Sequence, residues 1–215
     1  NWIEGDKNLW AVSSLILDRG KEEQIKAMTE RWMVRIMNVF WLQAWEKTNI
    51  KNDVLYTNFL CWCSFLYKKS LIEEPFFDFY KFYAEDMQLS WELILKWYEL
   101  GICRKSVIHH FWSGTMNMRP SYVKIFYETR NLLINYSAFF SFKTKFKLLP
   151  LFLIFHLLQI VSIPKNSFYV LKAKINSFSR LTKNKELVHK VRDRISNGRV
   201  LSEKEFLKTM SRKMA

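Results

Sequence analysis

The chain shows two kinds of hydrophobic pattern, one typical of strands and one typical of helices. Residues 10–17 form a short, mostly apolar run that stops at a turn signal at residues 18–20, which predicts a strand. Residues 21–47 are rich in Lys, Glu, Met and Trp, and they predict a largely helical segment. Residues 54–67 are aromatic and apolar with few charges, so we expect a strand that is buried on both faces.

The clearest helical pattern begins at the acidic residues 85–86. Its apolar face repeats at helical spacing and is formed by Met87, Trp91, Ile94 and Tyr98. Gly101 suits the position just after a helix end. Residues 103–108 then predict a strand that ends at the adjacent residues His109 and His110.

The second half of the chain predicts mainly helices. One follows Pro120 and extends to about Ser141, and residues 148–163 are nearly all apolar. Three polar residues in this apolar segment step by three and share one stripe of a helix, namely His156, Gln159 and Ser162. The segment has sixteen residues, fewer than the roughly 20 that span a bilayer. We expect a helix that lies at a membrane interface, or one that packs on the rest of the protein or on a second subunit.

These patterns divide the chain into three regions. Residues 1–116 contain both strands and helices, and residues 117–164 are helical and include the apolar segment 148–163. Residues 165–215 form a basic tail with helical patches near 187–195 and 203–210. The expected fold class is therefore α/β, followed by an α-helical carboxyl-terminal appendage.

Composition narrows the class of protein further. Hydrophobic residues make up 49% of 215 residues, which is enough for a sizeable core and argues against disorder. Only five glycines and four prolines occur, and this argues against a turn-rich all-β protein. Three cysteines without framework spacing favour a reducing compartment. The chain begins at Asn1 without a basic and then apolar leader, so we interpret it as a fragment without a signal peptide.

The net charge of +14 is concentrated near the carboxyl terminus. From Lys165 onward there are fourteen Lys and Arg against four Asp and Glu, a balance of about +10. Such a tail attracts anions: phospholipid headgroups, nucleic acid or phosphorylated ligands. No RNA-recognition, helix-turn-helix or zinc-finger pattern occurs in the sequence, so nucleic acid is not an expected partner.

The strongest candidates for catalytic residues are the adjacent acids Glu85 and Asp86. They stand at the predicted start of a buried helix, in the aromatic setting of residues 76–91, FFDFYKFYAEDMQLSW. Free N–H groups at a helix start favour an ionised carboxylate, which is the state that a general base requires. The alternative is that Asp86 only caps the helix.

Two further groups are candidates on weaker grounds. His109 and His110 end a strand, where an imidazole can bind a metal or a phosphate or can be purely structural. Adjacent residues of a strand point in opposite directions, so only one of the two is suited to a site. Residues 127–131, Tyr-Glu-Thr-Arg-Asn, lie on the later helix, and an exposed helix face explains them equally well.

In their order and spacing these elements resemble the second half of family 2 glycosyltransferases of the rhamnosyltransferase-like branch. The resemblance rests on the strand at residues 59–67, the block at 76–91, Gly101, the strand ending at His109, and the pair at residues 130–131. The tail at residues 191–207, VRDRISNGRVLSEKEFL, also resembles the carboxyl terminus of those enzymes. This likeness implies a partial GT-A fold, a Rossmann-like mixed sheet flanked by helices.

The resemblance also implies a reaction and its participants. A sugar would pass, with inversion, from a nucleotide-diphosphate-sugar donor to a hydroxyl of a glycan or lipid-linked acceptor, in polysaccharide biosynthesis. A divalent cation, Mg²⁺ or Mn²⁺, would stabilise the leaving diphosphate. The roles that the match implies are Asp86 as catalytic base, Glu85 as its orienting neighbour, His109 at the metal, and contacts to acceptor or donor from Trp91, Asp78 and Arg130.

The sequence departs from the family pattern at two helix positions and at its amino-terminal side. Gln88 stands where the family commonly has a second acid, and Glu92 stands where it has Arg. The nucleotide-binding half is missing and no Asp-x-Asp occurs, so this chain alone is expected to be inactive. We expect a cytoplasmic enzyme at the inner face of the cell membrane. Assembly into a homo-oligomer is compatible with the sequence. The alternative is a non-catalytic, membrane-peripheral binding module that uses the basic, apolar carboxyl terminus.

Overall fold

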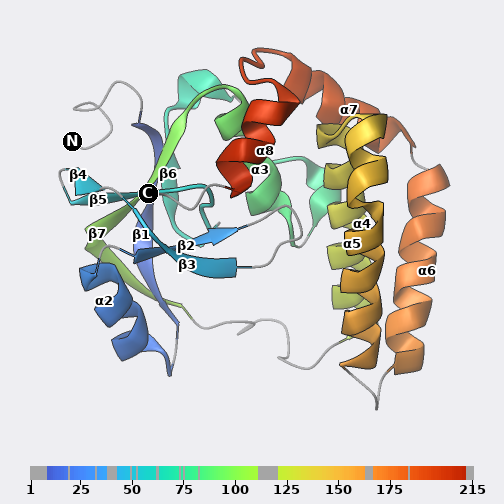
Figure 1. The fold of residues 1–215 in the computed structure, drawn as a ribbon, viewed down its shortest axis with the longest axis horizontal. Coiled ribbons are helices and arrows are strands. Elements are labelled where there is room, and N and C mark those ends of the chain that lie inside the picture. Colours follow the sequence, from blue (N-terminus) through green and yellow to red (C-terminus); the bar gives the residue numbers. More distant parts are fainter. Residues whose placement is uncertain are drawn as a thin grey trace. The chain divides into compact units, whose positions relative to one another are not determined.

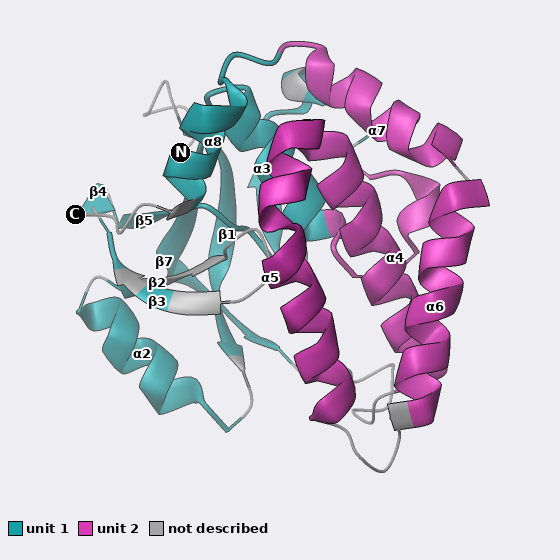
Figure 2. Ribbon diagram, turned by 45° about the vertical axis from the view of Figure 1, so that its right-hand side comes forward, with its two compact units in different colours: residues 1–75, 86–118, 199–215 teal, residues 76–85, 119–198 magenta. Residues whose placement is uncertain are grey.

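The computed structural model shows a mixed α/β protein. It describes residues 9–18, 20–31, 33–37, 43–48, 50–51, 53–61, 63–72, 74, 76–81, 83–110, 121–162, 167–183 and 185–211. The chain forms two compact units, coloured separately in Figure 2. The sheet unit comprises residues 1–75, 86–118 and 199–215, and the helical unit comprises residues 76–85 and 119–198. The α/β class is confirmed, while the units interleave along the sequence and do not follow the three consecutive regions expected.

A five-stranded mixed sheet forms the centre of the sheet unit (Figure 1). Its strands, in spatial order, are β4 (Ile50–Lys51), β5 (Val54–Thr57), β7 (Glu99–His110), β1 (Leu9–Asp18) and β6 (Phe65–Tyr67). β1 and β7 are parallel, and the other neighbours are antiparallel. Three helices belong to this unit wholly or nearly so: α2 (Glu22–Glu30), α3 (Glu85–Leu95) and α8 (Glu203–Ser211). Two 3₁₀ turns, Lys69–Leu71 and Asp78–Tyr80, precede α3 in the chain.

Gly101 has a packing role inside β7. A Cβ at this position would lie 2.3 Å from Cγ1 of Val54 and 3.1 Å from Cδ1 of Leu9, so only glycine lets the strands meet here. The prediction that Gly101 follows the end of a helix is wrong. α3 ends at Leu95, and the left-handed residue after it is Trp97, with φ of 66°.

α3 ends in a local turn, in which the N–H groups of Trp97 and Tyr98 donate to the carbonyl oxygens of Ile94 and Leu93. The carboxyl-terminal part of the chain completes this helix end. The carbonyl oxygen of Leu95 accepts hydrogen bonds from the N–H groups of both Val200 and Leu201, each 2.9 Å long. A helix leaves its last carbonyls without partners inside the helix, and these two donors satisfy one of them. Further along, Phe206 of α8 packs edge-on against Trp91, with ring centroids 5.6 Å apart. Part of the basic tail is therefore built into the sheet unit.

The segment from residue 21 to 47 is helical only in its first part. α2 covers Glu22–Glu30 as expected, but β2 (Met33–Met37) and β3 (Gln43–Lys47) then form an antiparallel pair. The prediction of a largely helical segment is wrong for this second part. Met, Lys and Glu are good helix formers, but the preference of each residue is small in free energy. Pairing with a neighbouring strand overrides it.

The apolar run at residues 54–67 contains two strands, not the single strand that we expected. β5 pairs with β7, whereas β6 pairs with β1 on the other side of the sheet. Between them the Oγ1 of Thr57 accepts a hydrogen bond from the N–H of Phe59, 3.3 Å long. Such a local side-chain bond competes with a strand ladder and ends β5. In this connection Cys63 is exposed, with its sulfur 3.4 Å from that of Cys61.

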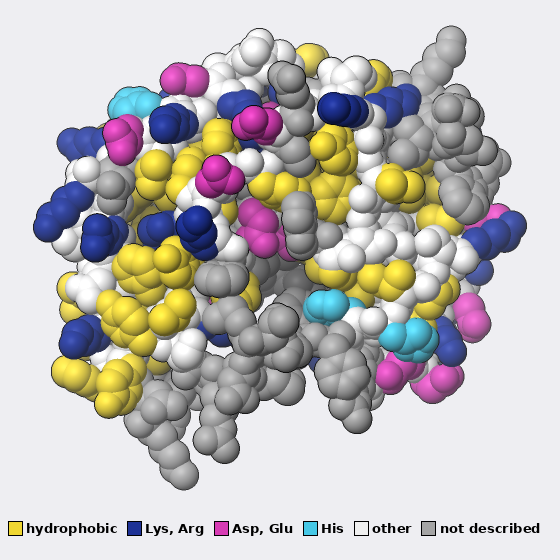
Figure 3. All heavy atoms as spheres, turned by 180° about the vertical axis from the view of Figure 1, so that it is seen from behind, with side chains coloured by type: hydrophobic (Ala, Val, Ile, Leu, Met, Phe, Trp, Pro, Cys, Tyr) yellow, Lys and Arg dark blue, Asp and Glu magenta, His cyan; other side chains and the backbone are white. Residues whose placement is uncertain are grey.

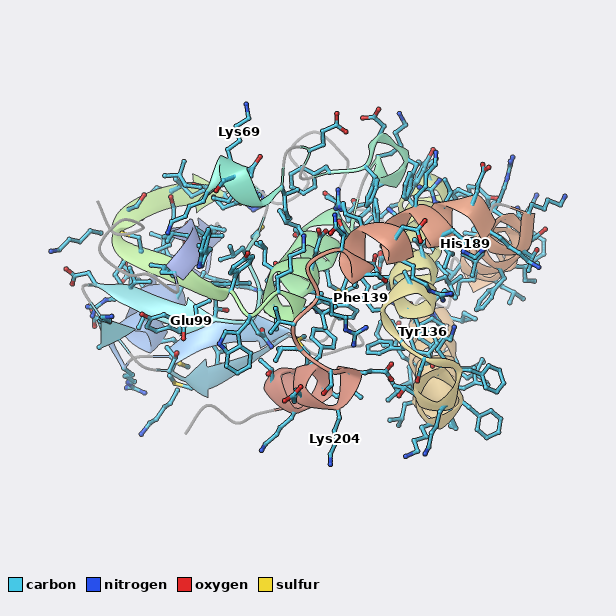
Figure 4. All side chains as sticks on the ribbon, turned by 90° about the horizontal axis from the view of Figure 1, so that it is seen from above. Lys69, Glu99, Tyr136, Phe139, His189 and Lys204 are labelled. Carbon is cyan, nitrogen blue, oxygen red and sulfur yellow. The ribbon has the colours of Figure 1, made fainter. Side chains whose placement is uncertain are left out.

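The helical unit consists of four helices (Figures 1 and 2). They are α4 (Tyr122–Phe139), α5 (Phe142–Val161), α6 (Ser167–Lys183) and α7 (Lys185–Ser196). Ser121 and Ser141 cap α4 and α5 by accepting the N–H groups of Lys124 and Thr144. α4 packs on both α6 and α7, and α5 packs on α6. Tyr136 of α4, labelled in Figure 4, stacks on Phe152 of α5 with ring centroids 4.8 Å apart.

The apolar helix is longer than its apolar run. α5 has 20 residues because it begins at Phe142, directly after its cap Ser141, and includes Lys143, Lys145 and Lys147, which precede the apolar run. The polar stripe was correctly placed on one face, since His156 is buried and both His156 and Gln159 contact α6 through Lys174. α6 is missing from the predicted helical patches, although α7 and α8 coincide with them.

Candidate functional site

Asp86 lies in the first turn of α3 and is half-buried. Its Oδ1 accepts a hydrogen bond from the N–H of Met87, 2.8 Å long, so the carboxylate partly satisfies the free donors of the helix start. Behind it the helix is buried from Met87 to Leu95. The geometry thus has the two features that sequence suggested, an acid at a helix start and an apolar helix behind it.

Glu85 has a different environment from Asp86. Its Oε2 is buried and has no hydrogen-bond partner within the described part of the chain. Burial raises the pKa of Glu85 above the ordinary value of a glutamic acid, and a backbone hydrogen bond offsets part of this effect. The two adjacent acids are therefore distinguished by their surroundings, and Glu85 holds its proton to higher pH than an exposed glutamate does.

The loop that leads to Glu85 has a strained backbone. Lys81, Tyr83 and Ala84 adopt left-handed conformations, with φ of 58°, 64° and 62°. Such conformations cost of order 1–3 kcal/mol each for residues other than glycine, and they persist only where the surroundings hold them. Three of them within four residues indicate that the surroundings determine the shape of this loop.

Two asparagines of α4 hold the loop. The Nδ2 of Asn131 donates to the carbonyl oxygens of Tyr80 and Tyr83, each at 2.8 Å, and the Nδ2 of Asn135 donates to that of Ala84 at 3.0 Å. The hydroxyl of Tyr80 donates to Oδ1 of Asn135. Both asparagines are fully buried. Because the Nδ2 groups of both buried amides donate to backbone carbonyls of the loop, they fix its path, and α4 thereby determines how Glu85 is presented.

Arg130 takes part in the same network. Its Nη2 donates to the carbonyl oxygen of Phe79, and its Nε and Nη2 donate to Oδ1 of Asn131 at 3.0 and 2.9 Å. These bonds turn the Nδ2 of Asn131 toward the loop. Burial lowers the pKa of Arg130, and its guanidinium lies over the ring of Tyr127, 4.7 Å from the centroid. The residue expected to contact a substrate thus uses its Nε and Nη2 for bonds within the protein.

The other predicted site residues are spread over both units. Trp91 is buried in the core of the sheet unit against Phe206. Asp78 is exposed in a 3₁₀ turn of the helical unit. His109 is exposed and His110 is half-buried at the end of β7, which agrees with opposite directions for the two side chains. The segment 111–115 that follows lies outside the described residues.

The two positions that depart from the family pattern form a buried polar chain. The Nε2 of Gln88 donates to Oε2 of Glu92 at 2.8 Å, and Nζ of Lys96 donates to its Oε1 at 3.0 Å. Glu92 is completely buried, and only 11% of the Lys96 side chain is exposed. The spacing of four residues places all three on one face of α3. Gln88 and Lys96 thus supply partners for both oxygens of the buried Glu92 carboxylate.

Among the residues that the structure describes, no three His, Cys, Asp or Glu side chains come together in a metal-binding group. His109 alone would supply one ligand, and Mg²⁺ prefers oxygen ligands in octahedral geometry. The expected cation therefore stays a proposal.

The sequence patterns did not predict that Asn131 and Asn135 hold the loop before Glu85. A usable signal was present, because two asparagines four residues apart share one face of a helix whose neighbours are apolar. Asparagine favours neither a helix interior nor an apolar environment. Its presence there indicates that nearby backbone groups need hydrogen-bond partners.

A second candidate surface is the apolar face of α5. Of the helices that the structure describes, α5 is the one long and apolar enough to cross a membrane, and only 11% of its most apolar window is buried. Exposed hydrophobic side chains lie along it, including Phe142, Phe146, Leu151, Leu153, Ile154, Leu157, Leu158 and Val161. Figure 3 shows the side opposite to the view of Figure 1, where hydrophobic side chains also lie among Lys and Arg. A continuous exposed face of this kind marks a contact with another protein or with a membrane.

Comparisons with protein-family models, with curated proteins and with solved structures found no match for this chain. Its function must therefore be inferred from its own residues and contacts.

Proposed function

We propose that this chain is the acceptor-side part of an inverting glycosyltransferase of the family 2 type, with a GT-A relation for its sheet unit. The observation that carries the proposal is the Glu85–Asp86 pair at the start of α3. A strained loop leads to it, and the two acids differ in their surroundings. A buried acid with a raised pKa, next to a second acid at a helix start, is typical of sites that move protons.

Asp86 acts as the general base in this proposal. Its carboxylate accepts the proton of the acceptor hydroxyl, and the hydroxyl oxygen attacks the anomeric carbon of the donor sugar. The bond from that carbon to the nucleoside diphosphate breaks, and the diphosphate leaves with the electron pair. One displacement inverts the configuration of the anomeric carbon. Glu85, whose pKa burial raises, orients the acceptor as a hydrogen-bond partner.

The proposed donor side lies at the end of β7. His109→Ala is expected to weaken binding of the nucleotide-sugar by about tenfold, the order of one charge-assisted hydrogen bond to a phosphate. The affinity is measured by calorimetry with a protein that also carries the nucleotide-binding half. His110→Ala is the matched control and is expected to change donor affinity much less, since His110 is half-buried and points the opposite way.

Equal effects of the two substitutions would show that the strand end has no specific role in donor binding. If neither variant changes the affinity, His109 is not part of the donor site.

The apolar face of α5 supports attachment of this enzyme to the cytoplasmic surface of a membrane. Apolar side chains that enter the interface contribute by burial, and each basic residue near an anionic surface adds about 1 kcal/mol. Lys143, Lys145 and Lys147 lie in the first turns of the same helix. Attachment at the membrane suits an acceptor that is linked to a lipid.

Intact protein is expected to float with phosphatidylglycerol vesicles at low salt and to float less at high salt, because salt screens the basic residues. Leu157→Gln combined with Leu158→Gln should leave most of the protein unbound. The matched control changes two exposed apolar residues of the sheet unit, Leu66→Gln and Val107→Gln. A truncation at residue 148 is unsuitable, since it removes α8 and its contact with Trp91.

Absence of flotation, together with self-association that the Leu157 and Leu158 variant abolishes, would assign the α5 face to a homo-oligomer. Flotation without any sugar transfer by the longer protein would favour the second candidate function, a non-catalytic module that binds membranes. The extent of the exposed α5 face is the observation that favours this candidate.

A further inference from the structure

The helical unit contains a cavity that the proposed transfer reaction does not use. Its volume is about 170 Å³, and it lies between α4, α5 and α6. This volume is enough for a small polar group and accompanying water. The lining residues are Lys124, Ile125, Glu128, Thr129, Gln159, Val170 and Lys174.

The most unusual lining residue is Lys174, whose side chain is only 3% exposed. Its Nζ donates to Oε1 of Gln159 at 2.6 Å and to Nδ1 of His156 at 2.7 Å. The third contact, to Oγ1 of Thr129, is at 3.5 Å, the outer limit of a hydrogen bond. One of the three ammonium donors is therefore poorly used and faces the residues that line the cavity.

The partners of Lys174 are neutral. Burial, together with the adjacent Lys174 ammonium, lowers the pKa of His156 to about 3, so the imidazole stays uncharged and accepts a hydrogen bond. Within the described residues no carboxylate lies within 4.0 Å of Nζ of Lys174. Burial lowers the pKa of Lys174 to about 8, and the carboxyl group of Glu128, in the lining of the same cavity, acts in the opposite direction. A buried cation that makes no direct ion pair is costly, and an anion bound within hydrogen-bond distance would reduce this cost.

The remaining charges around the cavity favour an anion with more than one charge. Lys124 of α4 is a second lysine in the lining, and its charge acts on Glu128. Its Nζ lies over the ring of Tyr83, 5.4 Å from the centroid, and turns from there toward the cavity in the proposed complex. Glu128 is the acid in the lining, and burial raises its pKa, the nearby lysines acting in the opposite direction. Its Oε1 receives only a long hydrogen bond from Gln159, at 3.4 Å. In its protonated form Glu128 would donate a hydrogen bond to an anion.

We propose that this cavity binds a phosphate monoester group, held by Lys174 and Lys124 with the hydroxyl of Thr129. Phosphate offers several acceptor oxygens at tetrahedral spacing, which suits donors that come from different helices. A carboxylate would leave one of the two ammonium groups without a charge partner. The group belongs to a lipid headgroup or to free phosphate, and the same residues would recognise both.

The surroundings of the cavity favour the lipid headgroup. The last turns of α5 carry Gln159 into the lining and expose Leu157, Leu158 and Val161. On α6, next to Val170 and Lys174, the exposed side chains are also large and apolar, among them Phe168, Leu171 and Ile175. A phosphate site bordered by apolar side chains suits a ligand with a charged head and hydrocarbon tails. This choice of source rests on the proposed membrane attachment, whereas phosphate binding itself does not.

The binding test uses inorganic phosphate and the intact chain, with calorimetry at pH 7. We expect saturable binding that Lys174→Met and Lys124→Met each weaken by about tenfold, as expected for a lost charged donor. Lys172→Met is the matched control, because Lys172 is exposed on the same helix, and it should leave binding unchanged. If Lys174→Met unfolds the helices, Lys124→Met still tests the proposal, because Lys124 is not fully buried and its replacement disturbs the packing less.

No saturable binding to the unchanged chain, or equal losses in all three variants, would overturn the proposal.

The source of the phosphate group, lipid headgroup or free phosphate, is decided with vesicles of phosphatidic acid and of phosphatidylglycerol at matched surface charge. We expect phosphatidic acid vesicles to capture the protein at a lower lipid concentration than phosphatidylglycerol vesicles do. Added inorganic phosphate is expected to release the captured protein. Equal capture by both vesicles would overturn the lipid source and leave the free anion as ligand. Flotation with phosphatidylglycerol depends on α5 and not on the cavity. Failure of phosphate binding is therefore distinguishable from failure of membrane attachment.

Discussion

Replacing Lys96 by methionine is expected to destabilise the sheet unit by about 3 kcal/mol or more, in the range of 3–5 kcal/mol typical of a broken buried ion pair. Glu92 is completely buried and depends on Lys96 for its positive partner, 3.0 Å away. Methionine keeps most of the side-chain volume, so the loss measures the charge left behind. Chemical denaturation, monitored by tryptophan fluorescence, reports the free energy of unfolding.

Two comparisons separate this effect from a general loss of lysine. Lys26→Met breaks an exposed pair with Glu23, 3.7 Å long, and is expected to cost below about 1 kcal/mol. Adding Glu92→Gln to Lys96→Met removes the buried charge, and Gln88 can still bond to the new amide, so most of the stability should return. Equal losses for Lys96→Met and Lys26→Met would contradict the assigned role of the buried pair.

Asp86→Asn is expected to lower turnover by about a hundredfold or more, the size of a general-base contribution. Asparagine retains an oxygen that can accept the N–H of Met87, 2.8 Å from Oδ1 in the structure, and it caps helices as well as aspartate does. Fold and donor affinity should therefore stay unchanged. The rate is measured as release of nucleoside diphosphate by a protein that includes the nucleotide-binding half.

A second substitution distinguishes catalysis from helix capping. Asp86→Ala removes the acceptor of the Met87 N–H and the charge in the first turn of α3, and is expected to cost up to about 1 kcal/mol of stability, whereas Asp86→Asn keeps the acceptor and should cost less. Glu85→Gln should reduce turnover less, since it acts by orientation, and Asp193→Asn on the exposed face of α7 serves as the control. Near-normal turnover in Asp86→Asn would leave capping as the whole role of Asp86.

The contacts of α4 explain why a site at Glu85 could be recognised only in part from the sequence. The acids, the helix behind them and the strand that follows are local patterns, and the structure contains all three. The amides of Asn131 and Asn135 bond to backbone carbonyls about fifty positions earlier in the chain. Periodicity places these asparagines on one face of a helix, but the identity of their partners depends on how α4 packs.

The same limit applies to the ends and partners of elements elsewhere in the chain. The apolar run at residues 54–67 predicted a single buried strand, but the split into β5 and β6 depends on which strands they join, β7 and β1. The apolar spacing of α3 predicted its face correctly. Its end follows from a left-handed turn at Trp97, where the sequence carries no glycine to indicate it. Donors from residues 200–201, more than a hundred positions away, then satisfy the carbonyl oxygen of Leu95.

By itself, the sequence determined the mixed α/β class, the helices with clear 3.6-residue spacing and the uneven distribution of charge. These properties depend on near neighbours in the chain, because caps, periodic faces and turn residues act over a few positions. Only the tertiary structure decided that α8 belongs to the sheet unit and that Lys174 is buried beside a cavity. The physical reason is that a buried polar or charged group is stable only with partners, and its partners here come from helices distant in sequence.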